Sequence, residues 1–332
     1  MVPMSPMHAE CDCKDPVVHR HGRRRRRCVV CGQTWSIRSK PRGRKTSRIS
    51  ESLLRRLLVD GENTRRLAKD CRRSVETVRR RCRRECRRLV AEEALPRLPV
   101  GVDALVLVVD GLWFRFGKRK WVLYDMAVKP VGIPTAFFLE PLMLEGEECL
   151  RSWQQALATI PSDVYGRIRA LVVDGFSGCK AIARHHRWVM QMCHQHLDSR
   201  LLGRPGHRRA VRGEAVRSVA VEMIRQVRTT TDGLQLAVLK QALSEYARHP
   251  DLTARICGVI RRFLHDVALF RAYLDHHKLE LPTTTNSLEC RHGQLRLTVR
   301  GINNPQAAAL RVRSFTRLHP TITCNGHRIP QN

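Results

Sequence analysis

Two apolar runs that end in the same four residues constrain the fold of this chain more than any other feature. Residues 108–111 read Val-Val-Asp-Gly and close a run that starts at Asp103, and residues 172–175 repeat the same letters after a second run. Short apolar runs bounded by turn residues predict buried strands. If the two strands lie side by side and parallel, Asp110 and Asp174 meet at one edge of a sheet.

The segments around these two runs predict an α/β core. Turn residues separate the first run from three further stretches that are rich in aromatic and β-branched residues. The expected strands are 103–110, 113–116, 121–128, 133–139, 169–174 and 188–192. An amphipathic helix is expected over 147–160, another through Ala183, and another from Cys193. Three antiparallel strands followed by alternating strands and helices indicate an α/β sheet with a meander at one edge.

A repeated carboxylate at strand ends favours a cation site. Two facing carboxylates repel each other unless a cation lies between them, and Mg²⁺ or Mn²⁺ prefers oxygen ligands. Asp110 and Asp174 are therefore the first candidate metal ligands. Asp-Gly is also a common turn after any strand, so each pair taken singly has an ordinary structural explanation.

Glu289 is the third candidate carboxylate. Residues 285–289 read Thr-Asn-Ser-Leu-Glu, directly before a segment with helical spacing. This local pattern also matches a capping box, in which Asn286 would be the N-cap residue and the side chain of Glu289 would cap the N-terminus of the helix. The residues alone leave a catalytic carboxylate and a helix cap open.

Together these motifs resemble the DDE transposases of bacterial insertion sequences and their Mutator-like eukaryotic relatives. The resemblance includes a C-x-x-H spacing, matched by Cys193 and His196, and it covers residues 100–320 or so. It implies an RNase H-like core formed by residues 100–205 and 279–332, with a helical insertion over 206–278. It also implies that Asp110, Asp174 and Glu289 bind Mg²⁺ or Mn²⁺ and catalyse DNA strand cleavage and transfer.

The physical role of Cys193 and His196 stays open at this level. Two ligands are too few for a complete zinc site, and a buried thiol beside a hydrogen-bonded imidazole is an equally good interpretation.

The first 45 residues contain four cysteines and predict a zinc ribbon. Cys28 and Cys31 form a C-x-x-C pair followed by glycine, which is the spacing of a zinc knuckle, and Cys11 and Cys13 are the other pair. Because the second pair is C-x-C, His19 or His21 could replace one of its thiols. A basic tail with incidental thiols is the alternative.

Residues 46–95 predict a helix-turn-helix. Leucines with helical spacing precede Gly61, a second helix is expected over 64–70, and Ser74 can cap a third that runs to Leu89. Two short helices before a basic third helix are typical of a DNA-binding module. The residues expected to contact DNA are Arg79, Arg80, Arg81, Arg83 and Arg84. A solvated helical linker is the alternative interpretation.

The charge of the chain indicates a polyanionic partner. The sequence has 61 Lys and Arg against 30 Asp and Glu, a net charge of +31. Nucleic acid is the commonest intracellular polyanion. Double-stranded DNA is therefore the expected partner, as terminal inverted repeats and as target, with a homodimer or larger assembly forming on it.

The sequence also predicts where the protein works. The apolar run 104–109 is far shorter than the roughly 20 residues that span a bilayer, and residues 1–13 lack the pattern of a secretory signal. A cytoplasmic, nucleoid-associated bacterial protein that does not enter the membrane is expected. Two other functions remain alternatives to a transposase: a non-catalytic DNA-binding regulator derived from one, and an RNase H-like nuclease.

Overall fold

The computed structural model describes residues 13, 17–21, 25–36, 51–92, 98–202 and 214–323. The chain divides into two units, residues 1–48 and residues 49–332. The first unit contains an antiparallel sheet of three short strands, β1 (Val18–Arg20), β2 (Arg25–Cys28) and β3 (Thr34–Ser36). Trp35 is buried in this unit.

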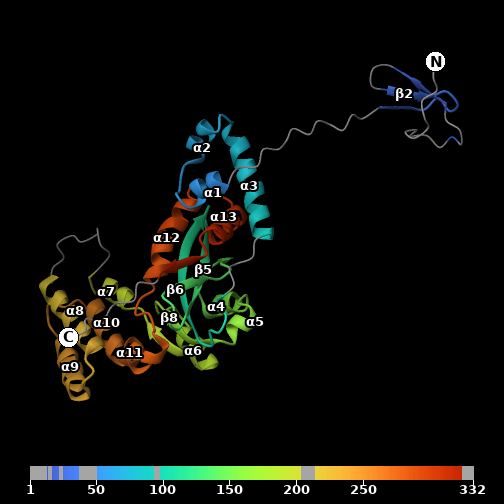
Figure 1. Ribbon diagram of the computed structural model, residues 1–332. Coiled ribbons are helices and arrows are strands. Elements are labelled where there is room, and N and C mark those ends of the chain that lie inside the picture. The colour runs from blue at the N-terminus through green and yellow to red at the C-terminus, as the bar shows by residue number, and fades with distance from the viewer. Residues whose placement is uncertain are drawn as a thin grey trace. The chain divides into compact units, whose positions relative to one another are not determined.

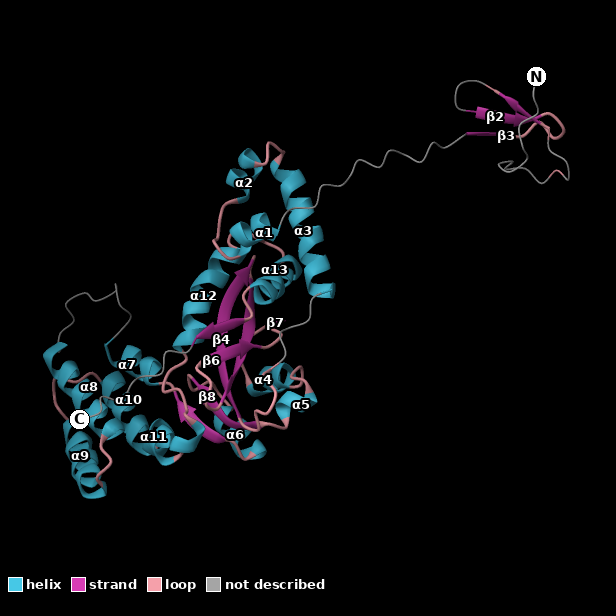
Figure 2. Cartoon of the chain, in the orientation of Figure 1, coloured by secondary structure: helices cyan, strands magenta, loops and turns pink. Residues whose placement is uncertain are grey.

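A mixed sheet of seven strands forms the centre of the second unit (Figure 2). Six strands follow the order β10-β6-β5-β4-β8-β9, and β7 pairs with β5 beside this path. The strands are β4 (Leu105–Phe116), β5 (Arg119–Pro130), β6 (Thr135–Phe138), β7 (Leu142–Glu145), β8 (Ile168–Val173), β9 (Val189–Met192) and β10 (Thr321–Thr323). The predicted α/β class is confirmed at this level.

Strand direction places the two Asp-Gly sequences in the expected relation. β4 pairs antiparallel with β5, and β5 pairs antiparallel with β6, as a meander of hairpins requires. β4 and β8 are neighbours and run parallel, and β9 continues the parallel half of the sheet. Asp110 on β4 and Asp174 at the end of β8 therefore belong to adjacent parallel strands.

The prediction that the first strand ends at Asp110 was wrong. β4 runs without a break from Leu105 to Phe116, and Gly111 pairs with Tyr124 of β5 in a regular ladder. The reason lies on the face of the sheet: a Cβ atom at residue 111 would come within 2.8 Å of Glu148 Oε1. Gly111 therefore makes room for a neighbouring side chain within a continuous strand, although Asp-Gly in a sequence is typical of a turn.

Helices cover both faces of the sheet. On one face, α4 (Leu150–Leu157) and α6 (Cys179–His186) pack their apolar sides against alternate residues of the strands, with Trp153 almost wholly buried. The short α5 (Ser162–Tyr165) leads into β8. On the other face, α12 (Asn286–Val299) buries Leu288 against Val106 and Val108 of β4.

The segment in which a helix-turn-helix is expected forms three helices: α1 (Glu51–Leu58), α2 (Thr64–Asp70) and α3 (Val75–Glu92). Ser74 caps α3, because its Oγ accepts a hydrogen bond from the backbone N–H of Thr77 at 3.2 Å. These helices do not have a core of their own. They share one with α12, α13 (Pro305–Leu318) and the far ends of β4 and β5 (Figure 1).

The described part of the segment expected as a helical insertion consists of helices joined by short loops. It contains α8 (Glu214–Thr229), α9 (Gly233–Tyr246), α10 (Ala254–His265) and α11 (Val267–Asp275), followed by a turn of 3₁₀ helix, η1 (His277–Leu279). α7 (His194–Leu202) joins β9 to this group. Figure 2 shows the group at a separate end of the sheet from α1, α2 and α3. Within the described ranges, no helix has the length and apolar character needed to cross a membrane.

Candidate functional site

Asp110 lies in the middle of β4, on the face of the sheet that α12 covers. Its side chain is 8% exposed, and the ladder with β5 fixes its backbone from both directions along the strand. A carboxylate on the inner face of a paired strand has little freedom to move. Asp110 is therefore a preorganised group, held by regular secondary structure and not by a loop.

Asp174 directly follows β8, and its side chain lies close to those of Asp110 and His196. Ligand atoms of Asp110, Asp174 and His196 all lie within 4.8 Å of one another. The backbone carbonyl of Asp174 accepts a hydrogen bond from Arg200 at 3.2 Å. Gly175 has a φ of +97°, a backbone conformation that residues with a side chain rarely adopt, so glycine is strongly favoured immediately after the carboxylate.

Glu289 lies in the first turn of α12 and faces α7. Its two carboxylate oxygens contact different residues of that helix: Oε2 accepts a hydrogen bond from Gln195 at 2.8 Å, and Oε1 lies 3.3 Å from His196 Nδ1. The helix begins after Thr285, whose side chain does not cap it. Glu289 is thus turned toward the other candidate residues, and the capping-box alternative does not describe it.

His196 is the common neighbour of the whole cluster. It belongs to the group with Asp110 and Asp174 and also to a second group, with Cys193 and Glu289, whose ligand atoms again lie within 4.8 Å of one another. Cys193 is buried, and its Sγ accepts hydrogen bonds from the backbone N–H and the hydroxyl of Thr285 at 3.4 and 3.5 Å. The thiol therefore links the start of α7 to the segment that leads into Glu289.

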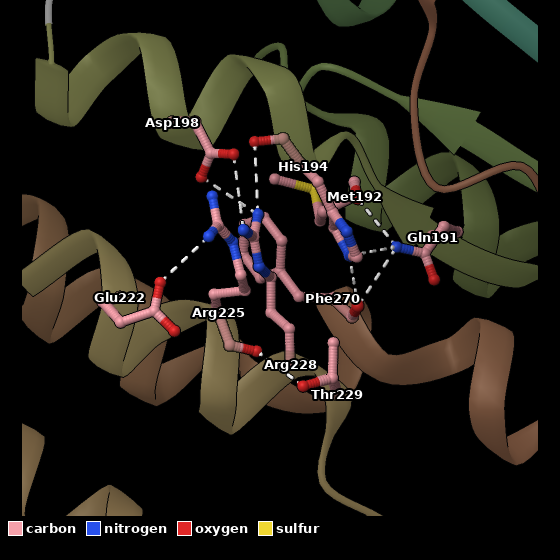
Figure 3. Close-up of polar contacts among 9 residues, drawn as sticks. All are labelled: Gln191, Met192, His194, Asp198, Glu222, Arg225, Arg228, Thr229 and Phe270. Carbon is pink, nitrogen blue, oxygen red and sulfur yellow. Dashed lines mark hydrogen bonds and ion pairs between the residues drawn. The ribbon is translucent and has the colours of Figure 1, made fainter. Parts of the chain in front are cut away.

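Residues of α8 and α11 hold α7 in place through polar contacts (Figure 3). His194 Nε2 lies 2.7 Å from the carbonyl oxygen of Phe270 on α11, and Arg228 on α8 pairs with Asp198 at 3.0 Å. Arg228 also donates to the carbonyl of His194, and its own side chain is nearly buried. Since α7 carries His196 and Gln195, the position of both depends on helices outside the sheet.

A second set of buried charges lies behind Asp110. Asp125 is directly opposite Asp110 in the β4–β5 ladder and is fully buried. His292 of α12 lies between the two carboxylates, with Nδ1 3.5 Å from Asp110 and Nε2 3.5 Å from Asp125. Arg291 approaches Asp125 to 3.4 Å, and its guanidinium stacks over Phe138. These pairs connect the helix of Glu289 to the strand of Asp110.

The pKa values of the cluster follow from burial and crowding. The pKa of Asp110 is raised to about 7, chiefly by burial; the negative charges of Asp174 and Glu289 also raise it, while His292 and His196 oppose the rise. Burial by itself would lower the pKa of His196, but contact with Cys193 and the charges of Asp174 and Asp110 raise it to about 9. His196 is therefore a cation at neutral pH that balances a crowded set of carboxylates.

Glu148 is a further carboxylate at this edge of the sheet. It precedes α4, contacts the position where Gly111 has no side chain, and accepts a hydrogen bond from Trp153 Nε1 at 2.8 Å. Burial raises the pKa of Glu148, and the charge of Asp174 raises it as well. The Trp153 bond fixes one oxygen and holds the carboxylate beside Asp174.

In the first unit, three of the predicted zinc ligands come together. The Sγ atoms of Cys13, Cys28 and Cys31 lie within 4.8 Å of one another. Cys28 ends β2, and the following turn closes with a hydrogen bond from Gly32 N–H to the Cys28 carbonyl, at a glycine with a φ of +74°. Cys11 lies outside the described residues. His19 and His21 are exposed, and neither is part of the thiol group.

The five predicted DNA-contacting arginines do not share one environment. Arg79 and Arg83 line a cavity between α3 and the end of α12. Arg80 and Arg84 are exposed on the outer side of α3, while Arg81 is half-buried. The buried side of the same helix consists of Val78, Cys82, Glu85, Cys86 and Leu89.

Sequence reasoning missed Glu148, His292 and Asp125. Two faint signals were present: Glu148 precedes a helix whose first apolar residues cover the Asp-Gly strand, and His292 lies three residues after Glu289 and hence on the same side of a helix. Asp125 gave no signal, because its role depends on strand register.

The sequence matches no model of a known protein family, and a comparison with curated proteins finds no similar one.

Proposed function

We propose that this chain is a DDE transposase, which binds the terminal inverted repeats of a mobile element and catalyses metal-dependent cleavage and transfer of DNA strands. The observation that carries the proposal is the position of Asp110, Asp174 and Glu289 around His196, although the three acids come from distant parts of the sequence. Crowded carboxylates cost free energy unless a cation is bound, so chance is a poor explanation for their arrangement.

The sheet supports an RNase H-like core for this enzyme. The order β6-β5-β4-β8-β9, antiparallel in its first half and parallel in its second, agrees with a three-stranded meander followed by two crossover units. The first acid lies on the central strand and the second on its parallel neighbour, and α12 brings the third across the sheet. The helices α8 to α11 would be the insertion between the second and third acids.

The residues of the site fit a divalent cation. Asp174 Oδ1 is buried and, among the described residues, has no hydrogen-bond partner. Asp110 and Asp174 would hold Mg²⁺ or Mn²⁺, with Glu289 as a further ligand. When bound, such a cation lowers the pKa of an attacking hydroxyl and stabilises the charge that develops on the leaving oxygen. Gln195 orients Glu289, and the β4–β5 ladder holds Asp110 in place.

A zinc ion would complete the N-terminal unit. Three converging thiolates are soft ligands that suit tetrahedral Zn²⁺, and Cys11, His19 or His21 would supply the fourth position. We propose a zinc ribbon here that acts with the helix-turn-helix on DNA. A homodimer or larger assembly on paired DNA ends, in the bacterial cytoplasm at the nucleoid, is part of the same proposal.

The alternatives differ from this function at the acidic cluster. A non-catalytic regulator has no need for Glu289 to be oriented by Gln195 and His196, so these contacts favour an enzyme. An RNase H-like nuclease would use the same carboxylates on a different substrate. Substrate choice therefore separates the two enzymes.

The test uses the full chain, Mg²⁺ or Mn²⁺, and three substrates of equal length: a duplex with the ends that flank the reading frame, a random duplex and an RNA–DNA hybrid. Wild-type protein is expected to cut the first substrate at the element ends. Asp110→Asn, Asp174→Asn and Glu289→Gln should each lower the cleavage rate about 100-fold or more while DNA binding is retained. Asp275→Asn changes an exposed acid and is the matched control. Cleavage of the hybrid alone would support the nuclease, and undiminished cutting by Glu289→Gln would refute the three-carboxylate site.

A further inference from the structure

A cavity of about 990 Å³ lies where the helix-turn-helix meets the C-terminal helices. Its walls come from the loop between α1 and α2, the first half of α3, the end of α12 and the start of α13. Ligand pockets in proteins are about 300–1,000 Å³, so this volume is at the upper end of that range. The cavity is separate from the acidic cluster.

The charge of the walls is strongly positive. Five arginines from four different elements line the cavity: Arg65, Arg79, Arg83, Arg300 and Arg311. Two acids, Glu62 and Glu76, also border it. Glu62 is already engaged, because Arg56 binds both of its oxygens at 2.8 and 3.0 Å. The cavity therefore has a surplus of guanidinium groups over available carboxylates.

The arginines lack partners that would explain why they gather. In the described part of the chain, no ion pair or hydrogen bond engages the side chain of Arg65, Arg79, Arg83 or Arg300. Arg311 is half-buried and donates one hydrogen bond, to the carbonyl of Thr298 at 3.0 Å. Burial lowers the pKa of Arg311, and the charges of Arg79 and Arg83 oppose its ionisation further.

An oxyanion would relieve this crowding. Guanidinium groups bind phosphate oxygens through paired N–H donors, and such bonds strengthen where water is partly excluded. A single carboxylate would neutralise one arginine, whereas consecutive phosphates of a nucleic-acid backbone match a cavity with arginines on several walls.

The position of the cavity beside α3 identifies the source of the phosphates. All four arginines of α3 in question are exposed, but only Arg79 and Arg83 line the cavity. Arg80 and Arg84 lie on the side of α3 opposite its buried residues, which is its outer side. A recognition helix in a major groove has a phosphate backbone along each of its flanks. A duplex against the outer side of α3 thus brings one backbone to the mouth of the cavity.

We infer that this cavity binds the backbone phosphates of the duplex that α3 recognises, through Arg65, Arg79, Arg83, Arg300 and Arg311, and that base contacts come from the outer arginines, Arg80 and Arg84. The inference rests on the proposed DNA-binding function. It assigns different contacts to four of the five predicted arginines and adds three arginines from outside α3.

Binding curves at several salt concentrations test this division. The probes are a duplex that the full-length protein selects from a random-sequence library and a random duplex of the same length. Arg79→Gln, Arg83→Gln, Arg65→Gln and Arg300→Gln should each weaken binding to both duplexes by the same factor. In each variant, the slope of log affinity against log salt concentration, which is negative, should become less steep by about 0.9, the value for one lost phosphate contact. Arg80→Gln and Arg84→Gln should instead weaken binding to the selected duplex about 5- to 150-fold more than to the random one.

The controls keep the outcomes distinct. Arg248→Gln changes an exposed arginine at the end of α9 and should alter neither slope nor preference. Arg65 and Arg300 are surface residues, so their variants remain informative if Arg311→Gln does not fold. An unchanged salt slope in the four cavity variants, or a loss of sequence preference in Arg79→Gln and Arg83→Gln, overturns the inference. Failure of the wild-type protein to bind either duplex overturns the proposed function itself.

Discussion

The two ends of α12 adjoin clusters of opposite charge, and the clusters are balanced in different ways. Near its N-terminal end, Asp110, Asp174 and Glu289 crowd together, but His196 and His292 lie among them. Near its C-terminal end, arginines crowd around a cavity with few acids to oppose them. The acidic cluster thus has imidazole groups beside its carboxylates, whereas few acids border the arginines of the cavity. Under the proposed function, the first cluster would bind a small cation and the second a large polyanion.

Removal of a counter-charge from the acidic side should have the largest effect on stability. Arg291→Leu leaves the fully buried Asp125 without its guanidinium partner, and loss of one member of a buried pair costs about 3–5 kcal/mol. Urea unfolding of the metal-free protein measures the change in the free energy of unfolding. Arg296→Leu, on the exposed side of the same helix, should change it by less than about 0.5 kcal/mol. Equal losses in the two variants would show that the buried pair has no special role.

The next effect depends on pH and follows from the raised pKa of Asp110. The folded pKa is about 7 and the unfolded value 3.8, so the folded state binds more protons between these two pH values. The contribution of this group to the free energy of unfolding therefore decreases as the pH rises from 4 to 7 and stays constant above pH 7. Asp110→Asn removes that loss. Because it also loses the contact with His292, we expect a net gain of about 1–3 kcal/mol above pH 7 and none near pH 4.

Unfolding of the wild-type and variant proteins in chelator, at intervals from pH 4 to pH 8, checks this expectation. Addition of Mg²⁺ should remove the difference by stabilising the wild type alone. A difference that is the same at every pH would mean that Asp110 does not bind its proton more tightly in the folded state.

The smallest effect is expected on the basic side, and its sign is opposite to that of Arg291→Leu. Arg79→Gln removes one of the crowded positive charges around Arg311, so the DNA-free protein should gain about 0.2–1 kcal/mol. The gain should disappear in high salt, because ions screen exposed charges. Arg248→Gln is again the matched control. A loss of stability at low salt would mean that Arg79 has a structural partner and that the cavity is not short of negative charge.

The sequence was sufficient for features that depend on local pattern. Apolar runs predicted β8 and the first half of β4, and the spacing of leucines and the position of Ser74 predicted the helices α1, α2 and α3. Asp110, Asp174 and Glu289 were recognised because each belongs to a distinctive short motif. Their roles as metal ligands stay a prediction, as do the DNA contacts of α3.

Features that depend on register and on packing could not be predicted in this way. Asp125 faces Asp110 because of the way β4 pairs with β5, and one residue of slippage would turn it to the other face. Gly111 looks like a turn residue because the side chain that needs the space, Glu148, is distant in sequence. The split among the arginines of α3 required the position of α13, which no pattern within α3 contains.

The shared core of the first and last helices has a consequence for synthesis on the ribosome. Thr298 Oγ1 donates to the carbonyl of Leu58, and Ser314 Oγ donates to the carbonyl of Cys86, so the two groups of helices are joined by bonds across most of the chain. Translation proceeds at about 5–20 residues per second. For many seconds, α1, α2 and α3 have left the ribosome while Leu295, Val312 and Phe315, which complete their core, do not yet exist. The nascent chain therefore exposes the apolar faces of α1, α2 and α3 until α12 and α13 have emerged and can cover them.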